Sequence, residues 1–255
     1  MLDSLLKTCA CPNGIAEGDY SFHPETGQGA GLRRTKQPER SFGGVDYFLI
    51  PSRGTKIPAM LDAIEGFILA GGNSRRMGTD KSQLVLNGQS FVELIAKQLS
   101  AVASSIKMVG GESLPKQTAL QIAPDVYPHW GALGGVHAAL SACSAGWALV
   151  VACDFPFVTS QLFLSLASVR GDFEAVAPIQ EDGIPQPLCS LYRVEPCLRR
   201  AEQLIKSGER KPIALLQSVR TRWVLFRELS KLEGADCFFD NINTPEDYAR
   251  VRERN

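Results

Sequence analysis

Hydrophobic and polar positions follow two different periods along residues 61–255, and the two periods alternate along the chain. Short apolar runs predict strands at 63–70, 105–110, 147–153, 173–179 and 188–194. Apolar side chains at helical spacing predict helices at 90–102, 133–143, 159–169, 195–208 and 244–254, and a last short strand is predicted at 238–243. This alternation predicts an α/β fold with a mostly parallel sheet and helices on both of its faces.

Capping residues stand at the ends of several predicted helices. Ser90, Thr159 and Thr244 occupy N-cap positions, where a hydroxyl oxygen can accept a hydrogen bond from the first turn. Pro245 fits the first turn of the helix over 244–254, and Gly208 fits the end of the helix over 195–208. The helix ends are therefore indicated by side-chain chemistry as well as by period.

Residues 1–60 show neither period. Glycine and proline make up 13 of these 60 residues but only 25 of the remaining 195, and only 45–50 has the apolar character of a strand. Arg33, Arg34 and Lys36 form a small basic cluster that is typical of a solvated tail. We expect a poorly ordered extension at 1–60, followed by one folded domain at 61–255. A start codon assigned too far upstream would give the same composition, so both interpretations stay open.

The charge balance narrows the function classes. The chain has 27 basic and 27 acidic residues, which argues against a generally basic nucleic-acid-binding protein. No apolar run reaches 18 residues, so we expect no membrane span. The seven cysteines are scattered and form no Cys-x-x-Cys pair, and the first residues are too weakly apolar for a secretory signal. We therefore expect a cytoplasmic protein, a monomer, with buried free thiols.

The densest chemical signal follows the first predicted strand. The strand ends at Leu69 and Ala70, and the chain then turns through Gly71 and Gly72. Ligands of open α/β sheets bind beyond the carboxyl ends of the strands. Glycines let backbone N–H groups approach a phosphate chain that a Cβ would obstruct. This turn is therefore a candidate phosphate-binding loop.

Basic residues follow the two glycines closely. Arg75, Arg76 and Lys81 can add positive charge against phosphate oxygens. The segment lacks the Gly-Lys-Ser/Thr ending of a Walker A loop, and its glycines do not have the Gly-x-Gly-x-x-Gly spacing of a dinucleotide-binding loop, because the next glycine after Gly72 is Gly78. The alternative is a plain glycine turn with exposed basic side chains.

Two aspartates follow later strands. Asp154 comes directly after the apolar run 147–153, so its carboxylate is expected at the same sheet edge as the glycine turn. A Mg²⁺ ion among triphosphate oxygens is typically held by one or two carboxylates. Asp154 could instead cap the next helix, although Thr159 fits that position better. Asp125 follows Pro124 and, taken alone, is most typical of a turn residue.

Five segments carry a resemblance to a known family. They are LAGGNSRRMGTDK (69–81), APDVYPHWGALGGVHAAL (123–140), VVACDFPFV (150–158), QPLCSLY (186–192) and FDNINTPEDY (239–248). In this order they resemble the small nucleotidyltransferases, and among these most closely the molybdenum cofactor guanylyltransferases. The resemblance covers about residues 63–250.

The resemblance implies a three-layer, Rossmann-like nucleotidyltransferase fold and a reaction. GMP would pass from GTP to the molybdenum-molybdopterin cofactor, and pyrophosphate would leave. The residues implied to bind GTP are Leu69, Ala70, Gly71, Gly72, Lys81, Asp125 and Asp154. Those implied to be catalytic are Lys81, Asp154 and Arg75, with Mg²⁺ as cofactor held at Asp154. Proteins of cofactor synthesis or molybdoenzymes are further implied partners.

The acceptor side and the base preference also follow by resemblance. Gln186, Asn241 and Asn243 would line the pterin side, although Asn-x-Asn-Thr-Pro is equally a strand-to-helix capping sequence. The sequence Ala70-Gly71-Gly72 favours a guanylyl over a cytidylyl enzyme, where Ala-Ala-Gly is usual. One departure is the sequence Val109-Gly110-Gly111-Glu112, where the family usually has an asparagine that meets the nucleotide. The alternatives are an enzyme that uses CTP or a sugar or polyol phosphate, and a catalytically silent nucleotide-binding adaptor.

The extension hypothesis predicts the behaviour of a shortened chain. A chain that begins at Leu61 is expected to keep its melting temperature and its pyrophosphate release, because the strand and helix pattern is complete without residues 1–60. A lower melting temperature or a loss of turnover would contradict the hypothesis.

Overall fold

The computed structural model describes residues 64–70, 84–111 and 120–254. Residues 1–60 lie outside this range, so the extension stays a prediction. The same holds for the segment 71–83, which contains the predicted site residues Gly71, Gly72, Arg75 and Lys81.

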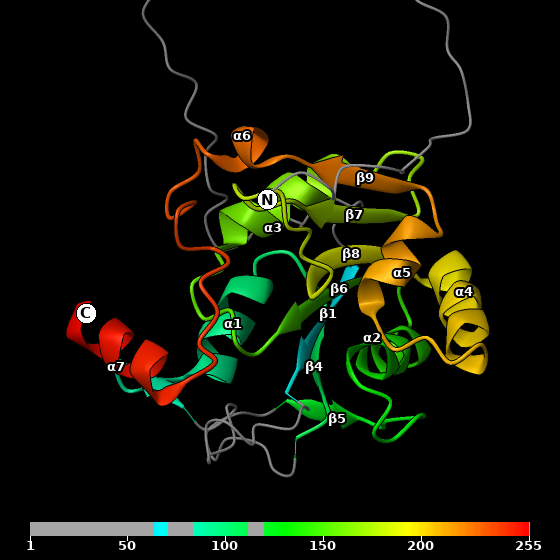
Figure 1. Ribbon diagram of the computed structural model, residues 1–255, viewed down its shortest axis with the longest axis horizontal. Helices are drawn as coiled ribbons and strands as arrows, with labels where there is room; N and C mark the ends of the chain where they lie inside the picture. Colours follow the sequence, from blue (N-terminus) through cyan, green and yellow to red (C-terminus); the bar gives the residue numbers. More distant parts are fainter. Residues whose placement is uncertain (1–63, 71–83, 112–119, 255) are drawn as a thin grey trace, which may run out of the picture. The chain divides into compact units, whose positions relative to one another are not determined.

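Within the described residues, seven strands form one sheet in the order β5-β4-β1-β6-β8-β7-β9 (Figure 1). The strands are β1 (Ile64–Leu69), β4 (Ile106–Val109), β5 (Gln121–Ala123), β6 (Trp147–Ala152), β7 (Ala175–Pro178), β8 (Cys189–Arg193) and β9 (Thr221–Val224). Neighbouring strands are parallel except at β8, which runs antiparallel to both β6 and β7. The predicted mostly parallel sheet is confirmed, with one reversed strand.

The two central strands consist of side chains that a covered sheet buries on both faces. All six residues of β1 are buried, as are the last five of β6. The one charged residue among them is Glu65, whose carboxylate lies 3.0 Å from the Lys107 ammonium. The parallel register pairs Leu69 with Ala152, so β1 and β6 end at the same level.

Helices cover both faces of this sheet, which gives three layers (Figure 1). α1 (Phe91–Leu99) and α3 (Ser160–Ser168) contribute to the apolar cluster on one face. α2 (Ala132–Ala142), α4 (Val194–Lys206) and α5 (Pro212–Gln217) contribute to the cluster on the other face. The prediction of helices on both faces is confirmed.

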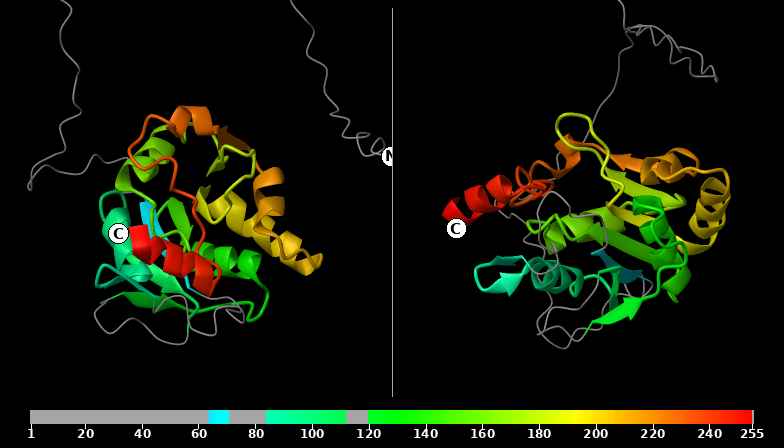
Figure 2. Two further views of the ribbon diagram at one scale, coloured as in Figure 1. Left: turned by 60° about the vertical axis from the view of Figure 1, so that its left-hand side comes forward. Right: turned by 60° about the horizontal axis from the view of Figure 1, so that its bottom comes forward.

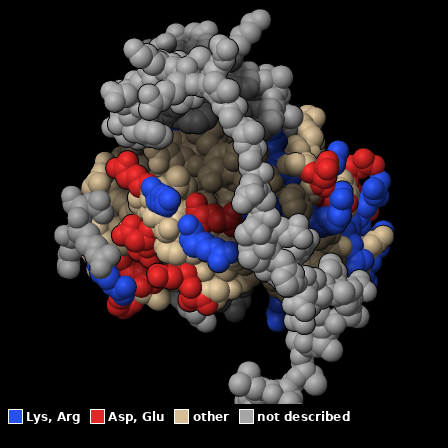
Figure 3. Space-filling model, turned by 90° about the horizontal axis from the view of Figure 1, so that it is seen from above, with Lys and Arg blue, Asp and Glu red and all other residues tan. Residues whose placement is uncertain are grey.

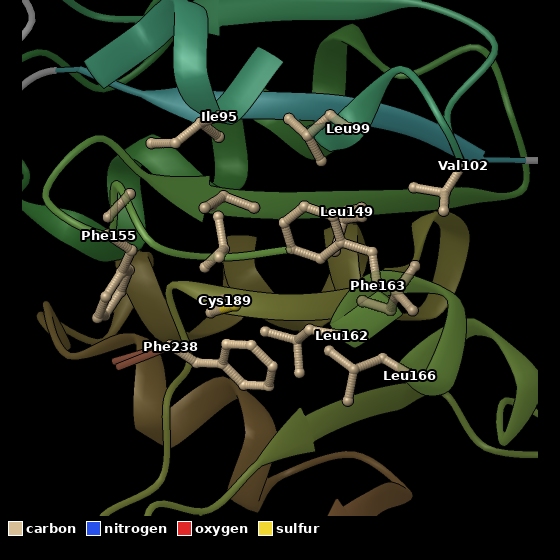
Figure 4. Packing of buried hydrophobic residues seen from close by; sticks show 14 of the residues in the cluster. Ile95, Leu99, Val102, Leu149, Phe155, Leu162, Phe163, Leu166, Cys189 and Phe238 are labelled. Atoms are coloured by element: carbon tan, nitrogen blue, oxygen red, sulfur yellow. The ribbon is translucent and has the colours of Figure 1, made fainter. Parts of the chain in front are cut away.

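The core between α1, α3 and the sheet is packed from several distant parts of the chain. Figure 4 shows its labelled residues, which are Ile95, Leu99, Val102, Leu149, Phe155, Leu162, Phe163, Leu166, Cys189 and Phe238. Most of these side chains are inaccessible to solvent. Burying a large apolar side chain stabilises the fold by about 1.5–3 kcal/mol, so this cluster is a main source of stability.

The predicted helix caps are present. Ser90 and Glu93 form a capping box, in which the Glu93 amide donates to the Ser90 hydroxyl over 3.2 Å and the Ser90 amide donates to the Glu93 carboxylate over 2.6 Å. The Thr159 hydroxyl accepts from the Leu162 amide over 3.3 Å and so begins α3. Each cap satisfies backbone donors that a helix leaves without partners.

A short hairpin precedes α1 and was not predicted. β2 (Val85–Leu86) and β3 (Gln89–Ser90) pair antiparallel around Asn87 and Gly88, both of which have positive φ. Asn-Gly between strands is a strong hairpin signal, because a type I′ turn needs positive φ at both residues. The hairpin lies next to the last helix, α7 (Pro245–Arg254) (Figure 2).

A small apolar cluster joins the hairpin to the carboxyl-terminal segment. Its buried members are Leu84, Leu86, Phe91 and Ile242. Tyr248 of α7 packs against this cluster, and its hydroxyl donates to the Val85 carbonyl over 2.5 Å. Two segments more than 150 residues apart are therefore fixed to each other.

The prediction of a strand at 238–243 is wrong. Phe238 and Phe239 lie in turns and are buried in the main core, and Ile242 is buried in the small cluster. These apolar residues are buried in two different clusters, and their spacing along the chain happens to resemble that of a strand. The elements that were missed entirely are β2, β3, β5, α5, β9 and α6 (Phe226–Leu229).

Within the described ranges, no helix has the length and apolarity that a bilayer crossing requires. Side chains of both charge signs lie near one another on the face that Figure 3 presents.

The capping box predicts a measurable loss of stability. Ser90→Ala removes the acceptor for the Glu93 amide and is expected to lower the free energy of unfolding by about 1 kcal/mol. Thermal melts should show a drop of roughly 2–4 °C. Ser168→Ala, which removes an exposed hydroxyl at the other end of a helix, is the matched control and should change the melt little. Equal melts for the two variants would contradict this role for Ser90.

Candidate active site

The candidate site lies at the edge of the sheet where β1, β4, β5 and β6 end. Leu69 and Ala70 are both buried there, at 7% and 8% exposure. The Ala70 amide donates to the Val109 carbonyl of β4 over 2.9 Å, and the Cys153 amide donates to the Leu69 carbonyl over 3.0 Å. The point at which the chain enters the segment 71–83 is thus held between the ends of two neighbouring strands.

Asp154 lies at this edge, two residues beyond β6, and is half-buried. Its backbone carbonyl accepts from the Ile242 amide over 3.2 Å. The Ala152 amide donates to the Leu188 carbonyl over 2.8 Å. Segments 186–192 and 239–248 therefore both meet the chain around Asp154, as their joint occurrence in one site requires.

The alternative that Asp154 caps α3 is excluded. The N-cap of α3 is Thr159, and the buried residues Phe155 and Val158 lie between it and Asp154. Asp154 therefore occupies the strand end for a reason other than helix capping.

The described residues form no complete cage for a metal ion. No group of three or more His, Cys, Asp or Glu side chains among them could enclose an ion. Mg²⁺ usually keeps its waters and binds one or two carboxylates plus substrate phosphates. Asp154 at the strand end fits a Mg²⁺ ion that arrives with a nucleotide.

Asp125 follows β5 and is exposed. Its carboxylate accepts from the Tyr127 amide over 3.1 Å, so Asp125 is a turn residue, one of the two roles expected for it. The turn leads into α2, whose N-cap is Gly131 with a φ of 76°. The carboxylate is thereby held in the loop that joins β5 to α2.

His137 is a structural residue of α2. It is 3% exposed, its ring meets the edge of Tyr127 at a centroid distance of 4.8 Å, and its Nε2 lies 3.8 Å from the Glu202 carboxylate. Burial lowers the pKa of His137, although the nearby Glu202 opposes this shift. His137 thus packs on Tyr127, whose backbone amide donates to the Asp125 carboxylate.

Two glycines end β4 next to Ala70. Gly110 and Gly111 have φ values of 72° and 82°, which L side chains rarely adopt. A Cβ added at Gly111 would lie 3.4 Å from the Ala70 Cβ and 3.2 Å from the Met108 Cε. Glycine backbone therefore lies beside Ala70 at the position where the resembling family usually has an asparagine.

Gln186, which the resemblance assigns to the pterin side, is 8% exposed and lies in the turn before β8. The backbone amide of Gln186 donates to the Pro178 carbonyl over 2.9 Å, and the backbone carbonyl of Gln186 accepts from the Ser190 hydroxyl over 2.7 Å. Because β8 is antiparallel to β6, this turn lies at the same sheet edge as Asp154.

Asn241 and Asn243 are exposed on either side of the buried Ile242. The capping alternative holds for the residues that follow: the Thr244 hydroxyl accepts from the Asp247 amide over 3.1 Å. The Asp247 carboxylate accepts in return from the Asn243 and Thr244 amides, and these bonds lower the pKa of Asp247. The capping role therefore uses the backbone of Asn243, and a pterin contact by the two asparagine side chains stays a prediction.

The cysteines of the described residues form no disulfide. Burial raises the pKa of Cys143 to about 11 and that of Cys197 to about 12, so both thiols stay protonated at neutral pH. The expected buried free thiols are found at Cys153, Cys189 and Cys197, whereas Cys143 and Cys237 are half-buried. Cys143 and Cys197 give no thiolate for nucleophilic chemistry.

One contact near the candidate site has no signal in the sequence. The Trp130 indole N–H donates to the Glu209 carbonyl over 2.8 Å, and the Leu133 amide donates to the Arg210 carbonyl over 3.3 Å. The partners are almost 80 positions apart and belong to no recognisable motif. Only the packing of α2 against α4 and α5 brings them together.

Comparison with known proteins places these features in a family. Residues 66–222 match the family described as MobA-like NTP transferase domain. The chain is 32% identical over 188 residues to a probable molybdenum cofactor guanylyltransferase of Pelotomaculum thermopropionicum. The matched residues make up 73% of this chain and 91% of that protein. This chain is 32% identical over 185 residues to a molybdenum cofactor guanylyltransferase of Vibrio atlanticus, which covers 71% and 91%.

Solved structures agree on the fold. Molybdopterin-guanine dinucleotide biosynthesis protein A of Archaeoglobus fulgidus superposes with a TM-score of 0.64 at 27% identity, over 74% of this chain and 97% of that one. The 2-C-methyl-D-erythritol 4-phosphate cytidylyltransferase of Thermus thermophilus, at 17% identity over 74% and 97%, gives a TM-score of 0.54 and shares the fold alone. The Rossmann-like nucleotidyltransferase fold is thus confirmed, and the chain belongs to the family of MobA-like NTP transferase domains.

Proposed function

We propose that the protein transfers GMP from GTP to the molybdenum-molybdopterin cofactor and releases pyrophosphate, with Mg²⁺ as cofactor. The similar proteins named molybdenum cofactor guanylyltransferase support this substrate pair. The observation that carries the proposal is the position of Asp154. The backbone around Asp154 is bonded on one side to the end of β1, through the Cys153 amide and the Leu69 carbonyl, and on the other to the segment that bears Asn241 and Asn243, through the Ile242 amide and the Asp154 carbonyl.

The proposed chemistry needs no protein base. A phosphate of the acceptor is already anionic when it attacks the α-phosphorus of GTP, so catalysis consists of positioning and charge neutralisation. Backbone groups of Gly71 and Gly72 bind the phosphates, and Lys81 with Arg75 neutralises the charge that grows on the α-phosphate and on pyrophosphate. Asp154 holds Mg²⁺, which when bound acts as a Lewis acid on phosphoryl oxygens.

Amide side chains would hold the acceptor. Gln186, Asn241 and Asn243 each offer two N–H donors and a carbonyl acceptor, which match the mixed donors and acceptors of a pterin edge. Their common position at the sheet edge next to Asp154 supports this assignment. It would present the acceptor phosphate toward the nucleotide.

The first test is the choice of nucleotide. Pyrophosphate release with molybdenum-loaded molybdopterin is expected with GTP, and CTP at the same concentration should neither react nor compete. Gly71→Ala should weaken the binding of GTP, because an added methyl group would crowd the phosphates or the base. Equal turnover with CTP would contradict the guanylyl assignment and leave the family membership intact.

The second test separates an enzyme from a silent nucleotide-binding adaptor. Asp154→Asn removes the charge that anchors the metal and is expected to lower kcat by about 10²–10³-fold, and Lys81→Ala should do the same. Thermal melts on each variant show whether the fold survives.

Asp172→Asn is the matched control, because Asp172 is exposed and precedes β7 at the opposite edge of the sheet. It should turn over normally. If Asp154→Asn and Lys81→Ala also turn over normally per folded molecule, neither residue belongs to the active site.

A further inference from the structure

The turn between α4 and α5 contacts the loop that carries Asp125. The Trp130 indole N–H donates to the Glu209 carbonyl over 2.8 Å, and the Arg210 guanidinium lies 4.6 Å from the centre of the Trp130 ring. The Arg210 side chain also reaches the His129 carbonyl at 3.4 Å. Hydrogen bonds, a cation–π contact and ring packing thus act on the same few atoms of the loop.

This turn is rigid before it meets the loop. The Glu209 carboxylate accepts from the amides of both Arg210 and Lys211, each over 2.8 Å. Pro212 follows at the first position of α5 and fixes the backbone there. The carbonyls of Glu209 and Arg210 are therefore presented in fixed directions toward Trp130 and Leu133.

The loop itself has a backbone that needs outside support. His129 has a φ of 62°, which costs free energy for a residue with a Cβ, and such conformations persist where surrounding contacts determine them. A Cβ at Gly134 would lie only 2.9 Å from the Trp130 Cβ and 3.2 Å from the Tyr127 carbonyl. Trp130 therefore lies directly on the first turn of α2, where only glycine leaves room for it.

The support extends to Asp125. Three residues before Trp130, the Tyr127 amide holds the Asp125 carboxylate, and the Trp130 amide donates back to the Tyr127 carbonyl over 3.1 Å. Tyr127 also packs on the buried His137. The direction of the Asp125 side chain is therefore tied, through two short turns, to the position of the Trp130 ring.

We infer that Trp130 and the Glu209–Lys211 turn form a clamp that positions Asp125 to accept a hydrogen bond from the guanine nucleotide. Trp130, Glu209 and Arg210 are positioning residues, which act on the nucleotide only through Asp125. This inference rests on the proposed function, in which Asp125 belongs to the GTP side. The clamp would set the affinity for GTP without taking part in the transfer step.

The test is calorimetric titration of the full chain with GTP and Mg²⁺. Trp130→Phe keeps a ring beneath Arg210 but removes the donor to Glu209, and the Kd for GTP is expected to rise about 3- to 10-fold. kcat at saturating substrates should stay within about twofold, because an interaction that serves binding alone appears in KM. Glu209→Ala should raise the Kd similarly, whereas Glu209→Gln keeps an acceptor for the two amides and should restore binding.

Trp147→Phe is the matched control. Trp147 also lies beneath an arginine, with Arg170 at 5.3 Å from its ring, but it begins β6 at the opposite edge of the sheet. This variant should bind GTP like the unchanged protein, even if its melting temperature falls. Equal weakening of GTP by Trp147→Phe and Trp130→Phe would show a general loss of stability and overturn the clamp.

A double-mutant cycle shows whether the clamp acts through Asp125. If it does, adding Trp130→Phe to Asp125→Ala weakens GTP no further, whereas independent effects would simply add. Additive losses, or unchanged binding by Trp130→Phe in a chain that binds GTP, would overturn the inference. Failure of the unchanged chain to bind GTP would instead overturn the proposed function and with it the basis of the clamp.

Discussion

The parallel pairing of β1 with β6 is the constraint on which the rest of the site depends. Both strands are apolar enough to be covered on both faces, so they occupy the centre of the sheet. Their register ends them together, and the Cys153–Leu69 hydrogen bond extends the pairing past the last strand residue. A shift of one residue would exchange the side chains of a strand between the two apolar clusters, for example Ile68 with Phe67, and would disrupt both. The packing of α1, α2 and α3 against these clusters therefore fixes the backbone at Asp154 relative to Ala70.

Apolar side chains also set the position of the segment 239–248. Ile242 lies between two exposed asparagines, yet it is buried with Leu84 and Leu86 of the hairpin and donates its amide to the Asp154 carbonyl. The hairpin begins directly after the segment 71–83. One buried isoleucine therefore holds the segment 239–248, the strand end at Asp154 and the hairpin together, and under the proposed function this would let two substrates meet in a fixed geometry.

Local signals in the sequence predicted what local physics decides. The apolar runs of β1 and β6 and the caps Ser90 and Thr159 could be identified because period and capping act within a few residues. The strand predicted at 238–243 failed because Phe238 and Ile242 are buried in different clusters, which only tertiary structure defines. The contact of Trp130 with the α4–α5 turn had no sequence signal, since it arises where two helices on one face meet.

The central proposal is that the nucleotide and the metal meet at Asp154, beside the end of β1. The most direct measurement is the position of Mn²⁺, used in place of Mg²⁺, in crystals of the full chain with GTP, located by its anomalous scattering. We expect a Mn²⁺ peak at coordination distance from an Asp154 carboxylate oxygen and from the triphosphate, with the nucleotide beyond Ala70. A peak coordinated by other residues, or a nucleotide bound away from the end of β1, would contradict it.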